Sequence, residues 1–558
     1  MMNNSSAQLP TPLDEIDRSL RQLCEGAPEL CESSLSERIQ LAKGCLKNIG
    51  ELFPAWVEKG CSAKRSGDTA AGRAEDLLTG PMTTMRFLHL VIGTLEDLKK
   101  TGKPKLPKEP KVVFGQLRVP VFPSRLLFDS LIFRGLTAET WLDESVTRDD
   151  LFCELIPSSP HVELVLGAGN VSSIPVTDAL TKIFQEDHVV LLKMNPVNDY
   201  LGPILEKILQ PLVQKNWLRF IYGGIEQGDH AVHHEAVDSI HITGAAASHD
   251  AIVWGRDPDE RDERKASQRP LVKKPVTSEL GNVTPWLILP GKYSSSQLHA
   301  QAESLAASIA NNASFNCIAT KMIVTWDGWP QREEFLELLQ SILDATPPRY
   351  AYYPGAAERF ARFSGQSSED YPNGHFPWIL RRNVSLEDEP HLFQEESFVC
   401  VVGETMLEAE SEVEFAERAA SFMNDQLVGT LAAGITVALE WEKQYAEEFD
   451  QLLRTLRFGT IGLNQWPGIA FGLMSPPWGG FPGATLADVQ SGIGLVHNTY
   501  LLRKPEKTIV RAPLNLRPKP VWFSTHRCPE AVAQKLCRLY ADPSVLRLPR
   551  LFASALRG

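Results

Sequence analysis

The chain has 558 residues, and this length predicts two or more domains because single hydrophobic cores rarely grow so large. With 43% hydrophobic and 22% charged residues, its composition is that of a globular protein and excludes a disordered chain. The net charge of -13 argues against a nucleic-acid-binding protein, which usually carries a basic face.

The nine cysteines are scattered along the chain and form no CxxC pair. This distribution fits neither a disulfide framework nor a zinc site, and it favours a reducing compartment. The N-terminal sequence lacks the basic and apolar regions of a secretory signal, and no stretch of about 18 apolar residues predicts a membrane span. We therefore expect a cytoplasmic protein with no integral membrane segment, no nucleic-acid partner and no bound metal.

The N-terminal part of the chain predicts helices. Apolar residues recur at helical spacing over 35–56, and a second helical stretch covers 80–100. The Pro- and Lys-rich segment 101–112 predicts a linker or an exposed crossing segment.

From residue 161 on, short apolar runs alternate with helical patterns. The apolar runs end in "GAGN", "KMNP", "YGG" and "TGAA". This alternation predicts an α/β fold with a parallel sheet covered by helices, in which ligands bind beyond the carboxyl ends of the strands. Neither a GxGxxG nor a Walker A sequence occurs, so the pattern alone identifies no nucleotide site. The highly charged run 255–275 predicts a solvated loop between two domains.

Cys317 lies in "NNASFNCIATK", between a long amphipathic helix expected to end near Asn311 and a predicted strand over 318–326. At such a junction a cysteine can face a cleft, where its thiolate is a strong nucleophile. A single cysteine is also often no more than a small buried apolar residue. The local pattern leaves both interpretations open.

Four motifs in order resemble those of the aldehyde dehydrogenase superfamily: "TSELGNVTP", "NNASFNCIATK", "FQEESFVCVVGE" and "GTIGLNQWPG…PPWGGFPGA". The upstream "GAGN", "LLK" and "ITGA" also stand where that family places an asparagine, a lysine and a T-G turn. The resemblance covers roughly residues 155–515. The sequence is thus similar to a divergent member of this superfamily.

The resemblance implies an α/β fold of the aldehyde dehydrogenase type, with a doubly wound, Rossmann-type cofactor domain, an α/β catalytic domain and a small β oligomerisation element. Residues 1–114 would be the helical N-terminal part of the cofactor domain, 115–160 the oligomerisation hairpin, 161–276 the NAD(P)-binding core and 277–470 the catalytic domain. Residues 471–558 would return to the cofactor domain, add an oligomerisation strand near "KTIVRAP" and end in a C-terminal extension. The family assembles through this β element, so a homodimer or homotetramer is expected.

The resemblance also assigns catalytic roles to three residues. Cys317 matches the nucleophile that adds to the aldehyde carbonyl, and Asn170 matches the amide donor of the oxyanion hole. Glu279 matches the base that activates water for thioester hydrolysis. On their own, Asn170 would as readily be a turn residue and Glu279 a surface charge or a helix-cap partner.

Five further residues match the family's positions for NAD or NADP. Lys193 corresponds to the lysine at the adenine ribose, and Thr243 and Gly244 to the turn near the pyrophosphate. Glu396 and Phe398 correspond to the pair at the nicotinamide. An ordinary strand-end lysine, an exposed glutamate and a core phenylalanine are the alternatives.

Several departures from the family pattern bear on function. Pro196 stands where a ribose-binding carboxylate is usual, so the choice between NAD and NADP stays open. Phe315 replaces an amide two residues before Cys317, and we interpret it as a determinant of the substrate.

The resemblance implies NAD(P)-dependent oxidation of a small-molecule aldehyde to a carboxylate through a cysteine thiohemiacetal and thioester. An acyl-CoA or fatty acyl reductase of the same superfamily, and a catalytically weak homologue, are the alternatives. The amphipathic, basic tail would cover the substrate mouth, touch a membrane or pack as a solvated helix.

Overall fold

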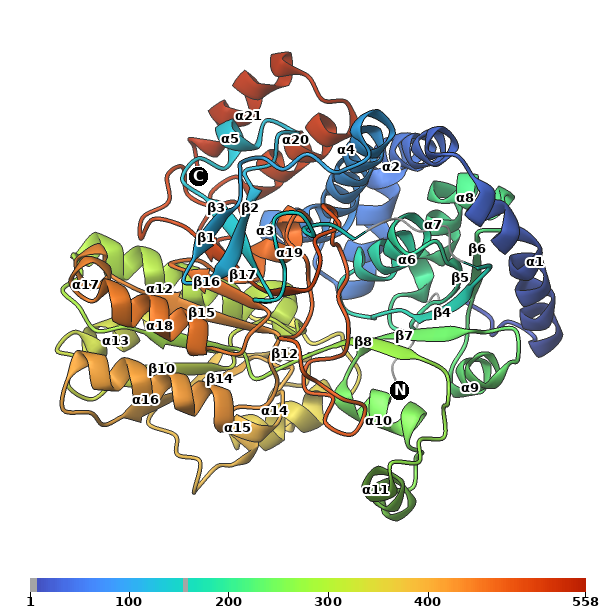
Figure 1. The fold of residues 1–558 in the computed structure, drawn as a ribbon. Coiled ribbons are helices and arrows are strands. Elements are labelled where there is room, and N and C mark those ends of the chain that lie inside the picture. The colour runs from blue at the N-terminus through green and yellow to red at the C-terminus, as the bar shows by residue number, and fades with distance from the viewer. Residues whose placement is uncertain (1–7, 154–158) are drawn as a thin grey trace.

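Two β-sheets lie side by side in the computed structural model, which describes residues 8–153 and 159–558 (Figure 1). One sheet has five strands and the other has ten. Within the described ranges, none of the helices combines the length and the apolar character needed to cross a membrane.

The five-stranded sheet is parallel throughout and has the order β6-β5-β4-β7-β8. Its strands are short apolar runs, buried on both faces as a parallel sheet requires. The chain runs from β4 outward to β6 and then returns to the other side of β4, so the strand order reverses beside β4. The strands are β4 (Val162–Leu166), β5 (Val189–Lys193), β6 (Leu218–Ile221), β7 (Ser239–Gly244) and β8 (Val276–Leu280).

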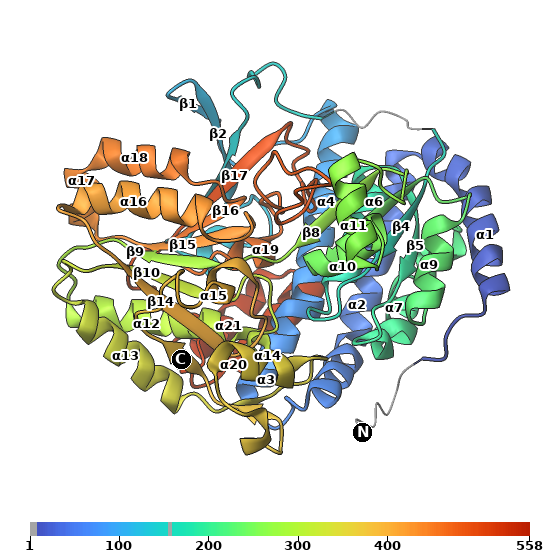
Figure 2. The ribbon, with the colours of Figure 1, turned by 90° about the horizontal axis from the view of Figure 1, so that it is seen from below.

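Helices from three parts of the chain share one hydrophobic core with this sheet (Figure 2). The expected N-terminal helices are present, with a π-helical turn (Leu78–Met82) around Pro81, which has no N–H to continue an α-helix. The helices on this core are α1 (Leu13–Glu32), α2 (Leu35–Lys64), α3 (Ala70–Leu77), α4 (Thr83–Thr101), α6 (Ile174–Gln185), α7 (Gly202–Ile208), α8 (Gln210–Gln214), α9 (Ile225–His233), α10 (Ala246–Val253), α20 (Pro529–Ala541) and α21 (Leu548–Ala555).

The ten-stranded sheet joins a parallel half to an antiparallel end, in the order β1-β2-β3-β17-β16-β15-β9-β10-β14-β13. The expected hairpin and the expected C-terminal strand meet at this end, because β3 pairs antiparallel with both β2 and β17. The strands are β1 (Lys111–Val113), β2 (Gln116–Phe122), β3 (Thr137–Leu142), β9 (Pro285–Ile288), β10 (Met322–Trp326), β13 (Ile379–Arg381), β14 (Val401–Leu407), β15 (Ala432–Thr436), β16 (Thr460–Leu463) and β17 (Pro505–Arg511). A separate two-stranded sheet pairs β11 (Arg349–Tyr350) with β12 (His375–Phe376).

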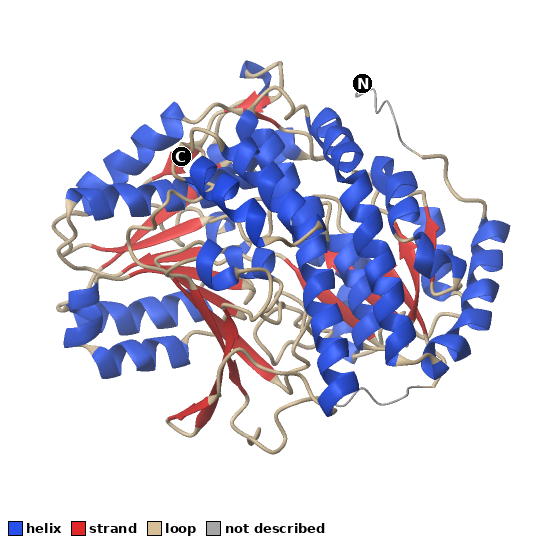
Figure 3. Ribbon diagram, turned by 90° about the horizontal axis from the view of Figure 1, so that it is seen from above, coloured by secondary structure: helices blue, strands red, loops and turns tan. Residues whose placement is uncertain are grey.

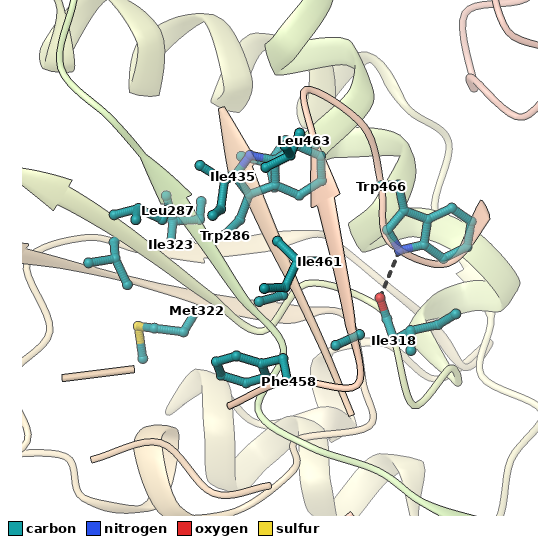
Figure 4. Packing of buried hydrophobic residues seen from close by; sticks show 14 of the residues in the cluster. Trp286, Leu287, Ile318, Met322, Ile323, Ile435, Phe458, Ile461, Leu463 and Trp466 are labelled. Atoms are coloured by element: carbon teal, nitrogen blue, oxygen red, sulfur yellow. Dashed lines mark hydrogen bonds between the residues drawn. The ribbon is translucent and has the colours of Figure 1, made fainter. Parts of the chain in front are cut away.

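Helices also cover the ten-stranded sheet, as the view in Figure 3 shows. Trp286, Ile323, Ile435 and Ile461 fill the core at its centre (Figure 4). The helices of this part are α5 (Asp129–Ile132), α12 (Ser295–Ala310), α13 (Arg332–Ala345), α14 (Ala356–Ser364), α15 (His391–Gln394), α16 (Glu412–Asp425), α17 (Leu439–Gln444), α18 (Ala446–Thr455) and α19 (Ile469–Leu473).

Two expectations from the sequence were wrong in detail. The predicted domain boundary after residue 276 falls inside β8, which pairs with β7, so the first sheet extends to Leu280. The predicted loop 255–275 contains the helix α11 (Pro258–Ser267), whose side chains are all exposed or partly exposed. Asp257 caps its N-terminus and Pro258 occupies the first turn, so local signals form this helix without a buried face.

Candidate active site

Cys317 follows α12 on a tightly turned loop. Three successive residues, Asn312, Ala313 and Ser314, have left-handed backbone angles, with φ of 52°, 55° and 67°. Such a run costs conformational energy in residues other than glycine, and neighbouring contacts must stabilise it. The Asn312 side chain does so by donating hydrogen bonds to the carbonyls of Asn170 and Phe315 at 3.0 and 2.9 Å.

Buried donors fix the rest of the loop. The Lys321 amine donates to the carbonyls of Asn316 and Ala319, each at 3.2 Å. The Trp466 indole donates to the carbonyl of Ile318 at 2.7 Å, next to the cysteine (Figure 4). These bonds hold the backbone on both sides of Cys317.

Glu279 faces this cysteine from the five-stranded sheet. It lies on β8, and its Oε1 is 3.9 Å from the Cys317 Sγ, which donates to it. The Trp478 indole donates to the same Oε1 at 2.9 Å. The second oxygen, Oε2, is buried and has no hydrogen-bond partner among the described residues. Glu279 is therefore held by one atom and has one free acceptor beside the thiol.

The surroundings favour the neutral forms of both groups. Burial and the nearby Asp178 raise the pKa of Glu279 to about 8. Burial, with the charges of Glu279 and Glu396, raises the pKa of the Cys317 thiol well above its ordinary value, while Lys321 acts in the opposite direction. The thiolate thus needs a proton acceptor close by, and Glu279 is in the position to be one.

Asn170 lies on the loop after β4 and reaches the cysteine loop. Its side-chain amide donates to the Phe315 carbonyl at 3.1 Å, and it is 7% exposed. The structure therefore brings Asn170 and Cys317 into one loop-to-loop contact, with the amide on a loop carbonyl.

Phe315 is 1% exposed and packs against Tyr352, Tyr353 and Phe398, with ring centroids 5.1 to 5.8 Å apart. The cavity at Cys317 is lined by other residues. The interpretation of Phe315 as a substrate determinant is therefore not supported, because its ring packs in the core behind the cysteine loop and not in the cavity.

Glu396 and Phe398 lie between α15 and β14. The Glu396 carboxylate packs on Gly281, where a Cβ would come within 2.0 Å of its oxygen. Burial raises the pKa of Glu396 to about 7, against the attraction of Lys321 and Arg359. Burial lowers the pKa of Lys321 to about 8, partly offset by Glu396 and Cys317. A buried acid and a buried base thus lie close to the thiol.

Lys193, Thr243 and Gly244 lie at the carboxyl ends of β5 and β7, on either side of β4. The Lys193 amine donates to the Gly223 carbonyl at 2.7 Å. Gly244 is exposed, and a Cβ added there would meet no atom of the described chain within 4 Å. The Thr243 hydroxyl, in contrast, donates to Asp178 at 2.8 Å and so faces α6. This edge, where the strand order reverses, is the expected place for a ligand.

The sequence interpretation missed three residues at the site. Trp478 holds Glu279, Lys321 anchors the cysteine loop, and Asp199 acts electrostatically on Lys193. Trp478 in "PPWGG" and Lys321 after "CIAT" belong to the motifs that carry the resemblance. Their side chains, an indole donor and an amine, were the signal that could have identified them. Asp199 lies six residues beyond Lys193 and carries no sequence signal.

The sequence matches no protein-family model and no curated protein. Solved structures do match. The glyceraldehyde-3-phosphate dehydrogenase of Methanocaldococcus jannaschii, complexed with NADP, superposes with a TM-score of 0.60 at 15% identity, over 91% of this chain and 96% of that one. An aldehyde dehydrogenase of Mycobacterium tuberculosis, complexed with NAD+, has a TM-score of 0.58 at 16% identity, over 91% of each chain.

Lactaldehyde dehydrogenase from Escherichia coli is similar as well, with a TM-score of 0.58 at 14% identity, over 91% of this chain and 92% of that one. At such identities the likeness concerns the fold. The chain therefore has the fold of the aldehyde dehydrogenases.

Proposed function

We propose that this protein oxidises an aldehyde to a carboxylate with NAD or NADP. The observation that carries the proposal is the placement of Cys317 and Glu279. Glu279 is on β8 and Cys317 on the loop before β10; their Oε1 and Sγ are 3.9 Å apart, and both residues line one cavity. A thiol and a buried carboxylate in this arrangement suit acyl chemistry on a bound carbonyl compound.

The roles of the residues follow from their positions. Glu279 accepts the thiol proton as Cys317 Sγ bonds to the carbonyl carbon, which forms the thiohemiacetal anion, and it then passes this proton to solvent and is a carboxylate again. After oxidation to the thioester, the same carboxylate takes a proton from water, whose oxygen attacks the acyl carbon and releases the thiol. Asn170 would donate to the oxyanion after its amide leaves the Phe315 carbonyl, a hydrogen bond of 3.1 Å.

The residues at the family's cofactor positions fit a dinucleotide in part. The Lys193 amine donates one hydrogen bond, to the Gly223 carbonyl, and has further N–H groups for a ligand. Glu396 Oε1 is buried without a partner among the described residues. Both suit ribose hydroxyls, and the exposed turn at Gly244 leaves room for the backbone to approach phosphates. When bound, the nicotinamide would supply the hydride acceptor. The carboxylate of Asp199 near Lys193 favours NAD, because its negative charge repels the 2′-phosphate of NADP.

An acyl-CoA or fatty acyl reductase is the second candidate. The pKa of about 8 at Glu279 favours it, since a carboxyl group that is largely protonated at pH 7 is a poor base for water. A catalytically weak homologue is the third possibility.

One assay separates these candidates. The purified protein is incubated with aldehydes and NAD or NADP, with and without coenzyme A, while reduced nicotinamide is followed. Turnover without coenzyme A that Cys317→Ala reduces by at least about 10³-fold supports aldehyde oxidation. A strict need for coenzyme A supports the second candidate, and the absence of turnover with every aldehyde refutes both.

Cys153→Ala is the matched control, because this exposed cysteine lies outside the site. It should keep full activity. An equal loss in both variants would mean that Cys317 has no special role.

We also propose a homodimer or homotetramer assembled at the antiparallel end of the ten-stranded sheet. The edge hairpin of β1 and β2 exposes Val112 and Phe114. Light scattering coupled to size exclusion should give a multiple of 62.0 kDa, which Phe114→Asp should lower.

A further inference from the structure

The cavity that begins at Cys317 and Glu279 has walls of large apolar side chains. Its volume is about 310 Å³, and its lining includes Ile174, Trp466, Phe471, Leu473 and Trp478. Cavities of this kind hold apolar ligands and orient them with few polar groups.

Several polar side chains in the wall are paired within the protein. Glu75 and Arg349 form an ion pair of 3.1 Å, and Glu75 also accepts from the backbone N–H of Asn312 at 2.8 Å. The hydroxyls of Thr79, Thr83 and Thr346 donate to carbonyls of their own helical turns. Among the described lining residues, Glu279 is therefore the one carboxyl or basic side chain without an ion-pair partner. The described lining therefore offers no unpaired positive charge to a phosphate or carboxylate on the substrate, and the Trp522 indole N–H is a buried donor there without a partner among the described residues.

A second, larger cavity of about 1570 Å³ lies on the other side of part of this wall. The two cavities share the side chains of Phe133, Val521, Trp522, Phe523 and Leu536. Four of these belong to the C-terminal tail, which therefore forms the wall between them. The outer cavity is lined by Leu131 and Leu556, which are 58% and 75% exposed.

From these observations we infer that the site takes an unbranched long-chain aliphatic aldehyde, whose alkyl chain lies in the apolar inner cavity beside Cys317, against the residues of the C-terminal tail that line it. This inner cavity is the passage for the alkyl chain. The inference rests on the proposed function and names its substrate class. Arg134, Glu334 and Arg517 are exposed and line the outer cavity, not the inner one.

Chain length is the measurable consequence. Each methylene group buried in the passage should raise kcat/KM about fourfold, which corresponds to about 0.8 kcal/mol. Small or charged aldehydes gain nothing from apolar walls.

Gly472 allows the passage to be narrowed. It lies on α19 and lines the inner cavity, and a Cβ added there would meet no atom of the described chain within 4 Å. A leucine at this position would fill part of the cavity, and an alanine much less.

The first experiment compares butanal, octanal and dodecanal with succinic semialdehyde. The expected result is a steep rise of kcat/KM with chain length. Gly472→Leu should lower kcat/KM for dodecanal at least tenfold and leave that for butanal within about twofold, while Gly472→Ala stays close to the wild type. Equal use of butanal and dodecanal, or a preference for succinic semialdehyde, would overturn the inference.

The second experiment needs no cofactor and no turnover. N-ethylmaleimide and N-dodecylmaleimide add to the Cys317 thiol, and mass spectrometry of the peptide measures each rate relative to that at Cys153 in the same chain. The dodecyl reagent should react faster at Cys317, and Gly472→Leu should remove this advantage. A chain-length preference without any aldehyde turnover would refute the proposed function alone. The absence of such a preference would refute the passage.

Discussion

At the scale of single residues, the site is defined by burial. Glu279 is 3% exposed, and its two oxygens have one indole N–H and one thiol between them as hydrogen-bond donors. A carboxylate in such a place keeps its proton to higher pH, which is why the pKa of Glu279 rises to about 8. The same desolvation makes it a stronger base once it is ionised.

Glu279→Gln tests this at the level of activity. A base must be ionised to act, so the rate of aldehyde oxidation by the wild type should rise with pH through about 8. The variant should lose about 10²- to 10⁴-fold in kcat and show no rise in this range. Stopped-flow and steady-state rates between pH 6 and 9 check the prediction.

Stability should respond to pH in the opposite sense. The folded-state pKa of Glu279 lies above its unfolded value of 4.5, so the stability from the protonated form is present below 4.5 and is lost as pH rises toward about 8. Glutamine does not titrate. The melting temperature of the variant relative to the wild type should therefore increase from pH 5 to pH 9, and a constant difference would contradict the raised pKa.

At the scale of elements, the cysteine loop is a strained segment between α12 and β10. Asn312 ties its left-handed turn to the carbonyls of Asn170 and Phe315, and Lys321 donates to carbonyls further along the loop. Lys321 is also a positive charge that lowers the pKa of the Cys317 thiol. One buried amine thus shapes the loop and assists the thiolate.

Lys321→Met should slow alkylation of Cys317 by iodoacetamide at pH 7.5 about tenfold, because loss of the positive charge raises the pKa of the thiol further. The effect should fade above pH 8, because the pKa of Lys321 itself is lowered to about 8 and its charge is lost there. Peptide mass spectrometry follows the reaction, with Cys153 as the internal reference. Lys321→Arg should restore most of the rate, and an unchanged rate in Lys321→Met would exclude the electrostatic role.

At the scale of the whole molecule, one buried arginine connects four distant segments. Arg86 on α4 donates to both Asp129 oxygens at 2.6 Å, to the Leu473 carbonyl at 2.6 Å and to the Tyr540 hydroxyl at 3.2 Å. Both Arg86 and Asp129 have fully buried side chains. Through them the N-terminal helices, the hairpin connection, the cavity wall on α19 and the C-terminal tail are held in one arrangement.

Asp129→Asn should therefore destabilise the protein by about 3–5 kcal/mol, because it leaves a buried cation without its counter-charge. The double variant Arg86→Met with Asp129→Asn should be less destabilised than the single one. Urea unfolding measures both. The exposed pair of Lys43 and Glu96 is the control, and Glu96→Gln should change stability by less than about 1 kcal/mol.

Much of the fold was predictable because it depends on local patterns. Short apolar runs predicted β4, β5, β6 and β7, and the resemblance placed the hairpin against the C-terminal strand; all are present. The loop with the hidden helix α11 was missed because its signal was capping and not apolar periodicity. The predicted boundary failed at β8, since pairing to β7 is a long-range choice that no local pattern expresses.

The sequence by itself determined the order of the strands and helices and the presence of a thiol, a carboxylate and an amide in a recognisable order. Only the tertiary structure decided that Cys317 and Glu279 are in contact and that Phe315 lies outside the cavity lining. It also decided that Trp478 donates to Glu279 and that Lys321 donates to the cysteine loop. It likewise decided that Val521, Trp522, Phe523 and Leu536 of the C-terminal tail line the cavity at the thiol. The physical reason is that propensity and periodicity act between near neighbours, whereas burial, pKa and cavity shape arise where segments hundreds of residues apart pack together.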